Sequence, residues 1–344
     1  MRLANREIDM RTMTTNIAAF LLSSVLTFTA AQAAEDKTYV MKLGTATINE
    51  SQHEWCKKFV AMVESDSGGR IKGEIYPASQ LGAIPRQIEG VQFGAIQGYV
   101  GPPEFLAGID ERYEVLSAPG LVSDMAHEVR VVNDPELLKL MLGLGADKGI
   151  HGAALFIAQP SLIIARVPIR HVADLAGKKL RVFAADMQQE MIKSLGASPV
   201  AMTLGDVLPA IQQGTIDGSV LAMTVITTMH FWDAAKYATE IDQPFIFSMA
   251  FLSKKWFDSL PADLQAIVDA DAARAAVEVN PWEVEFYNKA RQTWAEHGEL
   301  IRLPENEQAE MIKSVTAIGA AVAKRKSSLE PAYEVFAAAA KRTK

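Results

Sequence analysis

The chain has almost no cysteine and no excess of positive charge. Cys56 is its single cysteine, so no disulfide can form within one chain, and we expect a buried, inert thiol. Asp and Glu number 41 against 34 Lys and Arg, giving a formal net charge of −7. Because binding to nucleic acid or anionic lipid needs a basic surface, this balance predicts no nucleic-acid partner.

Motifs of enzymes and of cofactor-binding proteins are also missing. The glycine-rich stretch at 143–149 follows a helical pattern and precedes a strand, which is the reverse of a dinucleotide-binding loop, so it indicates a turn. No metal-ligand spacing occurs among the histidines, which are His53, His127, His151, His171, His230 and His297. We therefore assign no catalytic residue, metal or cofactor. An enzyme whose Ser, His and Asp meet only in space is kept as an alternative.

No apolar run is long enough to cross a bilayer comfortably, which takes about 20 residues. Arg2, Arg6 and Arg11 precede a shorter apolar run at 17–30, and small residues follow at 31–33. This order is typical of a cleaved signal peptide, so we predict that residues 1–33 are removed and that the protein is exported to the periplasm.

What the chain does contain is a regular alternation of strands and helices. Hydrophobic residues make up 49 % of the sequence, enough for a substantial core. Strand patterns at 38–47, 71–77 and 95–101 are separated by two amphipathic helices. A second group of strand patterns lies at 152–158, 162–167, 180–183, 199–202 and 216–223. The alternation predicts mostly parallel α/β units with helices on both faces, and two such units imply two lobes.

A long helical pattern runs from Pro261 to Gly298. It would be about 55 Å long at 1.5 Å per residue, and Pro281 should kink it. A helix of this length is expected to cross both lobes. We assign residues 34–157 and about 245–280 to lobe I, and residues 158–244 and about 281–344 to lobe II.

Arg181 is the strongest candidate for ligand binding. It lies in an apolar setting near the carboxyl end of the strand at 180–183. Ligands of open α/β sheets bind beyond such strand ends, and a guanidinium there can hold a carboxylate through two parallel hydrogen bonds. The alternative is an exposed arginine on an edge strand.

Four segments together resemble one protein family. They are ADLAGKKLRV at 173–182, LGASPV at 195–200, AIQQGTIDG at 210–218 and PASQLG at 77–82. The chain resembles the DctP-type solute-binding proteins of TRAP transporters over almost its whole length after the signal peptide. The resemblance implies a periplasmic-binding-protein-like fold, in which two α/β lobes flank a cleft and a long helix spans both. It also implies a receptor that delivers a small organic acid to a permease of small and large membrane subunits, with Arg181 pairing with the ligand carboxylate.

Several positions depart from the sialate-binding members of that family. Ala184 stands where they have Asn, and Pro102 and Phe105 replace an acid and an arginine. Where those members have Gln-Glu-Asn-Pro, this chain has SVLA at 219–222, and the position of their second arginine falls around residues 159–161 here. Apolar residues that replace polar contacts disfavour sugar acids. They predict a monocarboxylate with an apolar or aromatic body, such as a 2-oxo acid or a benzoate-like acid.

Beside Arg181, we name seven further ligand-binding candidates, each of which has a place in an ordinary core as its alternative. They are Phe183, Tyr99, Met223, Trp232, Gln159, Ser161 and Leu221. We expect a monomer whose lobes close on the ligand, with hinge strands near Ala158 and near 239–244. A ligand sensor that signals to a kinase would use the same fold, while an ABC-type or tripartite-tricarboxylate binding protein would lack the long kinked helix.

Overall fold

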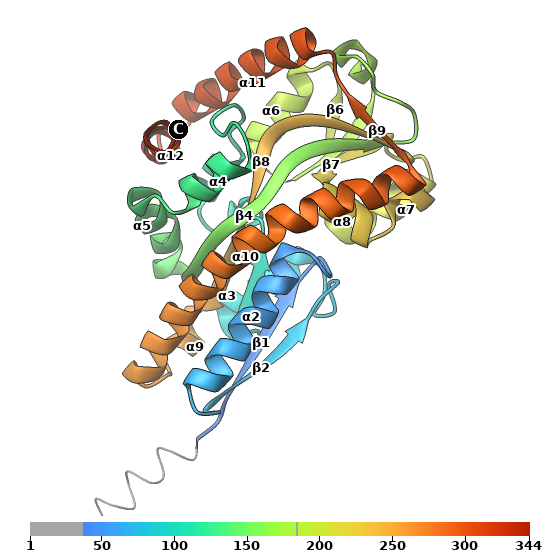
Figure 1. The fold of residues 1–344 in the computed structure, drawn as a ribbon. Coiled ribbons are helices and arrows are strands. Elements are labelled where there is room, and N and C mark those ends of the chain that lie inside the picture. Colours follow the sequence, from blue (N-terminus) through green and yellow to red (C-terminus); the bar gives the residue numbers. More distant parts are fainter. Residues whose placement is uncertain (1–36, 184) are drawn as a thin grey trace, which may run out of the picture.

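A computed structural model describes residues 37–183 and 185–344 (Figure 1). The predicted signal peptide, its cleavage after Ala33 and the departure at Ala184 lie outside these residues. Within the two described ranges, no helix is both long and apolar enough to span a bilayer.

The first α/β unit confirms the predicted alternation. Strands β1 (Tyr39–Thr45), β2 (Ile71–Tyr76) and β3 (Gly98–Gly101) are parallel, with β1 in the middle. Helices α2 (Ser51–Asp66) and α3 (Ile84–Phe93) connect them. Cys56 is fully buried on α2, as predicted.

The second α/β unit has the same design and again follows the sequence pattern. Its parallel strands and its helices are β5 (Lys179–Val182), α6 (Asp186–Ser194), β6 (Ser198–Ala201), α7 (Leu204–Gln212), β7 (Gly218–Ala222) and α8 (Met223–Thr228). Strand β7 ends at Ala222, one residue before the predicted end, because the chain turns directly into α8.

Two long strands join the units and correct one expectation. The patterns at 152–158 and 162–167 belong to one strand, β4 (Ile150–Ala165), which pairs antiparallel with β8 (Tyr237–Ser253). The two parallel units are therefore parts of one mixed sheet with the order β2-β1-β3-β8-β4-β7-β5-β6, in which only the pairs made with β4 and the β3–β8 pair are antiparallel. The apparent break in β4 is a set of register shifts on either side of Pro160, which has no N–H for the ladder.

The remaining elements connect or cover these units. They are η1 (Pro103–Leu106), η2 (Glu111–Ser117), α4 (Met125–Val132), α5 (Pro135–Gly143), η3 (Ala146–Lys148), η4 (Val172–Leu175), η5 (Phe231–Asp233), α9 (Lys254–Phe257), β9 (Glu299–Arg302), α11 (Glu305–Arg325) and α12 (Glu330–Arg342). The glycine-rich stretch is a helix-to-strand turn, as predicted: Gly145 and Gly149 have φ of 72° and 86°, which favour glycine.

Helix α10 (Ala262–His297) is the long helix that the sequence predicted. Its 36 residues correspond to about 54 Å. It packs against α2 of the first unit, along β4, and against α8 of the second unit (Figure 1). The chain stays helical through Pro281, and a kink there stays a prediction.

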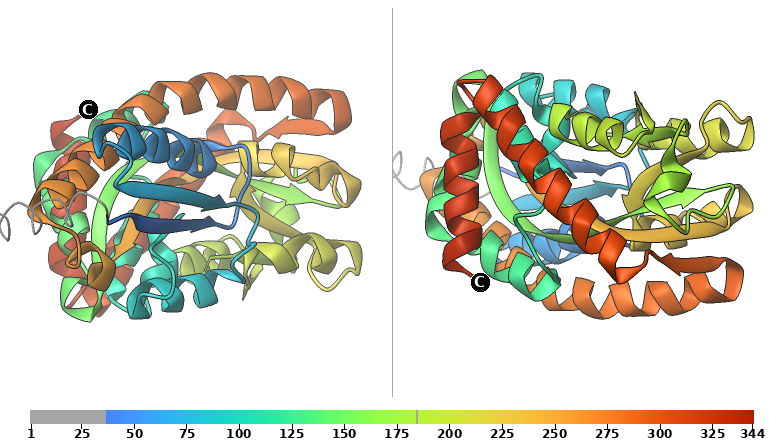
Figure 2. Two further views of the ribbon diagram at one scale, coloured as in Figure 1. Left: turned by 90° about the horizontal axis from the view of Figure 1, so that it is seen from below. Right: turned by 90° about the horizontal axis from the view of Figure 1, so that it is seen from above.

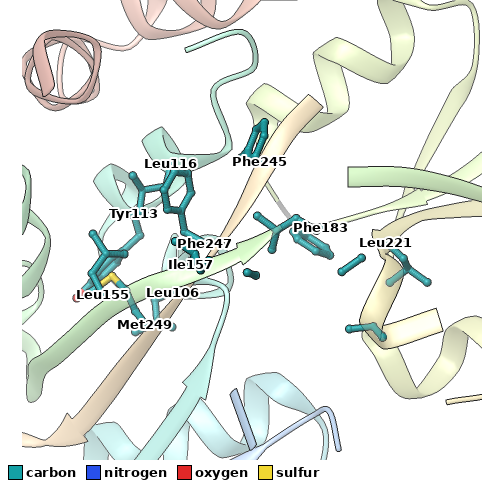
Figure 3. Packing of buried hydrophobic residues seen from close by; sticks show 14 of the residues in the cluster. Leu106, Tyr113, Leu116, Leu155, Ile157, Phe183, Leu221, Phe245, Phe247 and Met249 are labelled. Carbon is teal, nitrogen blue, oxygen red and sulfur yellow. The ribbon is translucent and has the colours of Figure 1, made fainter. Parts of the chain in front are cut away.

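The buried apolar residues form three clusters. One lies between α2, the first unit's strands and α10, and another lies between β5, β7, α6 and α11. The largest runs through the middle of the molecule and includes residues of both units. In this central cluster, Phe183 and Leu221 of the second unit belong with Ile157 and Phe247 of the long strands (Figure 3).

The last two helices lie across both units. Helix α11 packs against α6, whereas α12 packs against α4, α5 and η2 (Figure 2). Lys326, which follows α11, contacts the carboxylates of Glu114 on η2 and Asp186 on α6 at 3.0 and 2.6 Å. The segment after residue 305 therefore ties the two units together, and the division into lobes at 157/158 and 280/281 stays a proposal.

Candidate functional site

The candidate site is a cavity where the strands of both units end. The lining comes from the carboxyl ends of β1, β3, β5 and β7 and from the middle of β4. The cavity encloses about 480 Å³ of empty space, part of it open to solvent. The position is the one at which open α/β sheets bind ligands.

Most of the lining is apolar. Aliphatic and aromatic side chains surround a few polar groups, and the lining residues are Ala46, Thr47, Glu50, Gln52, Ile84, Tyr99, Pro102, Phe105, Ala158, Gln159, Arg181, Phe183, Leu204, Leu221, Ala222, Thr224, Val225 and Ile246. The rings of Phe105 and Phe183 form one wall, with their centroids 5.2 Å apart. Such a wall is suited to the apolar body of a ligand.

Arg181 is the only arginine or lysine among the described residues that line the cavity. Its side chain is 1 % exposed, and its Nε donates to the carbonyl oxygen of Met202 at 3.0 Å. Its guanidinium lies 4.8 Å from the centre of the Phe183 ring. Within the described residues, Nη1 has no hydrogen-bond partner and the guanidinium has no carboxylate within ion-pair distance. Burial lowers the pKa of Arg181 to about 9.

Tyr99 offers a second unsatisfied polar group. Its hydroxyl is buried and has no hydrogen-bond partner in the described part of the chain. A Cβ at Gly101 would lie only 2.2 Å from this hydroxyl, so the glycine leaves the room that the ring needs. Burial raises the pKa of Tyr99 above its usual range, and the Arg181 charge lowers it. Two buried donors without partners therefore line one cavity, which is suited to binding an anion.

The loop after β1 places a carboxyl group in the lining. Glu50 caps α2, and its Oε1 accepts the backbone N–H groups of Gln52 and His53 at 3.1 and 3.2 Å. The Thr47 hydroxyl also donates to it. The amide oxygen of Gln52 accepts the hydroxyl of Thr45 at 3.0 Å. Burial raises the pKa of Glu50, and these hydrogen bonds oppose the rise.

Gln159 lies on β4 and is held by a second group of buried polar residues. Its Nε2 donates to Thr224 Oγ1 at 2.6 Å and to Glu283 Oε1 at 2.7 Å. Its Oε1 accepts the backbone N–H of Thr224 at 3.1 Å. Both N–H groups and the oxygen of the Gln159 amide are therefore hydrogen-bonded to other protein groups.

Five of the eight candidates from the sequence line the cavity: Arg181, Phe183, Tyr99, Gln159 and Leu221. The other three candidates lie elsewhere. Met223 is fully buried beside the lining residue Ala222, and the Ser161 hydroxyl donates to the carbonyl oxygen of Pro244 at 2.6 Å. Trp232 stacks on His230 and His297, at centroid distances of 4.7 and 4.3 Å.

Sequence reasoning missed the polar residues that follow β1 and β7. Thr47 and Glu50 lie in the loop between β1 and α2, Gln52 lies in the first turn of α2, and Thr224 lies in the first turn of α8, which follows β7. The rule that ligands bind beyond strand ends, which selected Arg181, would also have found these positions. Glu283 had no such signal, because it lies within a long helix far along the chain.

The geometry defines a class of protein. The cavity contains one buried, unpaired cation, an apolar wall and no group of three or more His, Cys, Asp or Glu residues that could hold a metal ion among the described residues. These features define an α/β solute-binding protein for a small anion.

Comparison with known proteins supports this class. The chain matches the family model for bacterial extracellular solute-binding proteins, family 7 (DctP), over residues 44–326. It is 26 % identical to the C4-dicarboxylate-binding periplasmic protein DctP of Rhodobacter capsulatus, covering 78 % of this chain and 81 % of that protein. It is also 26 % identical to the 2,3-diketo-L-gulonate-binding periplasmic protein YiaO of Escherichia coli, covering 66 % and 69 %.

Solved structures of the same fold agree. A TRAP periplasmic solute-binding protein from Desulfovibrio salexigens with bound orotic acid superposes with a TM-score of 0.84 at 22 % identity, covering 89 % of this chain and 100 % of that one. A sugar-acid-binding protein from Advenella mimigardefordensis with galactonate gives 0.84 at 22 % identity, covering 90 % and 99 %. The chain belongs to the DctP family, and it is a solute-binding receptor, not an enzyme.

Proposed function

We propose that this receptor captures a monocarboxylate with an apolar or aromatic body and holds the carboxylate at Arg181. The supporting observation is the buried guanidinium whose Nη1 has no partner in the described part of the chain. A buried charge without a partner is unfavourable, and a ligand carboxylate would remove that penalty. The Tyr99 hydroxyl would donate a further hydrogen bond to the same carboxylate.

The lining gives the ligand body its expected character. The polar groups of Thr47, Glu50 and Gln159 are hydrogen-bonded to other protein groups, so a ligand rich in hydroxyls would lose water without full replacement. The Phe105–Phe183 wall would instead contact an apolar chain or a flat ring. A 2-oxo acid or a benzoate-like acid fits this description better than a sugar acid.

Titration calorimetry on the purified protein tests the proposal. The panel contains benzoate, 2-oxopentanoate, a branched 2-oxo acid, orotate, succinate, galactonate and sialate. We expect dissociation constants in the micromolar range, about −8 kcal/mol, for one or more of the apolar monocarboxylates. Tight binding of sialate or galactonate, with no heat from the apolar acids, would reject the proposed ligand class while leaving the family assignment intact.

We further propose that the two lobes close around the ligand by bending in β4 and β8. Support comes from irregular pairing near Ala158, where the ladder register shifts. There the backbone N–H groups of Ile157 and Ala158 donate to Asn280 Oδ1 at 3.1 Å and Glu128 Oε1 at 3.2 Å. Backbone bonds made to side chains allow the strand to bend without breaking a continuous ladder.

The expected setting is the periplasm, reached through the signal peptide at 1–33, with the loaded receptor delivering its solute as a monomer to the small and large subunits of a TRAP permease. A sensor for a signalling kinase is the alternative role. Neighbouring genes that encode a small and a large membrane subunit would favour transport, and a neighbouring kinase gene would favour sensing.

A further inference from the structure

Gln159 lines the cavity but has no free N–H to offer a ligand. Its two amide hydrogens are directed to Thr224 Oγ1 and Glu283 Oε1, at 2.6 and 2.7 Å. The Thr224 backbone N–H fixes the amide oxygen at 3.1 Å, so the side chain cannot turn over without losing these bonds. Gln159 therefore presents an amide that is already satisfied.

Glu283 maintains this arrangement from outside the cavity lining. It lies on α10, is fully buried, and accepts from Gln159 through Oε1, while its Oε2 has no partner among the described residues. Burial raises its pKa, and the neighbouring carboxyl groups of Glu50 and Glu128 raise it further. No Lys, Arg or His of the described chain forms an ion pair with any of these three acids. This side of the cavity is thus acidic or neutral, and it lacks a cation.

We propose that Glu283 is a specificity-determining residue that restricts the receptor to ligands with one carboxylate. It acts as a positioning residue, since it accepts an amide hydrogen of Gln159 that a ligand could otherwise use, and it adds a third carboxyl group near those of Glu50 and Glu128. Among the described residues of the lining Arg181 is the single cation, so a second carboxylate has no counter-charge there, and Gln159 offers it no free amide N–H. This inference rests on the proposed binding of a carboxylate at Arg181.

Two ligand pairs of matched shape measure this selectivity. 2-Oxopentanoate and 2-oxoglutarate differ only in a terminal methyl or carboxylate, and benzoate and terephthalate differ by one carboxylate on the ring. The readout is the ratio of dissociation constants, dicarboxylate over monocarboxylate, measured by calorimetry at pH 7.5. In the wild-type protein we expect a ratio of at least about 100, because a buried carboxylate without a partner is strongly unfavourable.

The test variant is Glu283→Gln, which keeps the side chain's shape and removes the carboxylate. The new amide can present its own N–H, so the acceptor that holds Gln159 is weakened, and one of the three neighbouring carboxyl groups is removed. We expect the ratio to fall at least about tenfold, mainly through tighter dicarboxylate binding. Thr224→Val, which removes the other acceptor of the Gln159 amide, should lower the ratio in the same direction.

The matched control is Asp271→Asn, which also changes a buried acid of α10 to its amide. Asp271 is 2 % exposed, but it contacts Arg274 at 3.1 Å and is not part of the cavity lining. The ratio of dissociation constants for Asp271→Asn should therefore equal that of the wild type. A wild-type ratio below about three would overturn the inference even if Glu283→Gln did not fold. So would an unchanged ratio in a folded Glu283→Gln protein.

Failure of the proposed function gives a different result. If Arg181 does not hold a carboxylate, none of the four acids binds the wild-type protein, or Arg181→Met binds them as well as the wild type does. If only the inference about Glu283 fails, monocarboxylates still bind in an Arg181-dependent manner, and dicarboxylates bind with similar affinity.

Discussion

Replacing Arg181 with methionine should stabilise the ligand-free protein and abolish ligand binding. Burial lowers the pKa of the guanidinium from 12.5 to about 9. At about 1.4 kcal/mol per pKa unit, keeping the charge costs the folded state about 5 kcal/mol. The hydrogen bond to Met202 and the contact with the Phe183 ring together return about 3 kcal/mol. The net cost is therefore about 2 kcal/mol, which Arg181→Met removes.

The sign of the pH dependence follows from the lowered pKa. The folded protein binds the Arg181 proton less tightly than the unfolded chain does, so the whole cost is present below pH about 9. It decreases only as the pH rises toward 12.5, so at neutral pH the variant should show its full advantage. We expect the free energy of unfolding in urea to rise by about 2 kcal/mol and the melting temperature by about 4 °C.

The assay compares wild type, Arg181→Met and Arg166→Met with and without 2-oxopentanoate or benzoate. Arg166 is a surface arginine whose ion pair with Asp217 spans 3.4 Å, so its replacement should change stability by no more than about 0.5 kcal/mol. Ligand at 100 times its dissociation constant should stabilise wild type and Arg166→Met by about 2.7 kcal/mol and leave Arg181→Met unchanged. A ligand-free Arg181→Met protein that is less stable than the wild type would refute the reasoning, because the guanidinium would then have a structural role.

Three further outcomes are expected. Tyr99→Phe should weaken carboxylate binding about tenfold in calorimetry without lowering the melting temperature, because its hydroxyl has no protein partner in the described chain; unchanged affinity would remove the hydroxyl from the site. Cys56, whose thiol pKa is raised by burial, should react with a thiol reagent only after unfolding in urea, and rapid labelling of the native protein would contradict this. Burial raises the pKa of Glu104 to about 8, so the native state favours the protonated form and stability should fall as pH rises from about 4.5 to 8. Glu104→Gln should reduce that fall. If urea titrations show that the variant gains the same free energy of unfolding over wild type at pH 5 as at pH 8.5, this account of Glu104 is wrong.

The local patterns of the chain predicted its elements well. The helices at 51–66, 84–93 and 262–297 and the strands of both α/β units follow from side-chain periodicity, since each buries one apolar face. The patterns on either side of Pro160 predicted two separate strands, because a proline between the polar residues Gln159 and Ser161 is typical of a strand end. In the structure β8 pairs with the residues on both sides of that irregularity, so β4 continues. Pairing with a strand about 80 residues away leaves no local signal.

The site residues also fall into those that the sequence could predict and those that it could not. Arg181, Phe183 and Leu221 could be chosen from the sequence because they lie at the ends of strands that local patterns predict. Met223 and Trp232 are apolar residues of the same kind in the same region, yet neither lines the cavity. Periodicity places a residue in the interior but does not say whether its neighbour there is another side chain or an empty space.

The amino-acid sequence by itself determined the class of fold, the family and the single arginine suited to an anion, because these depend on periodicity and on short contiguous motifs. Only the tertiary structure decided that this arginine is buried without a partner in the described chain and that Gln159 is held by Glu283, 124 residues away along the chain. Hydrogen-bond satisfaction and the cost of burying a charge depend on which distant residues come together. They are therefore properties of the folded arrangement and not of any local stretch of sequence.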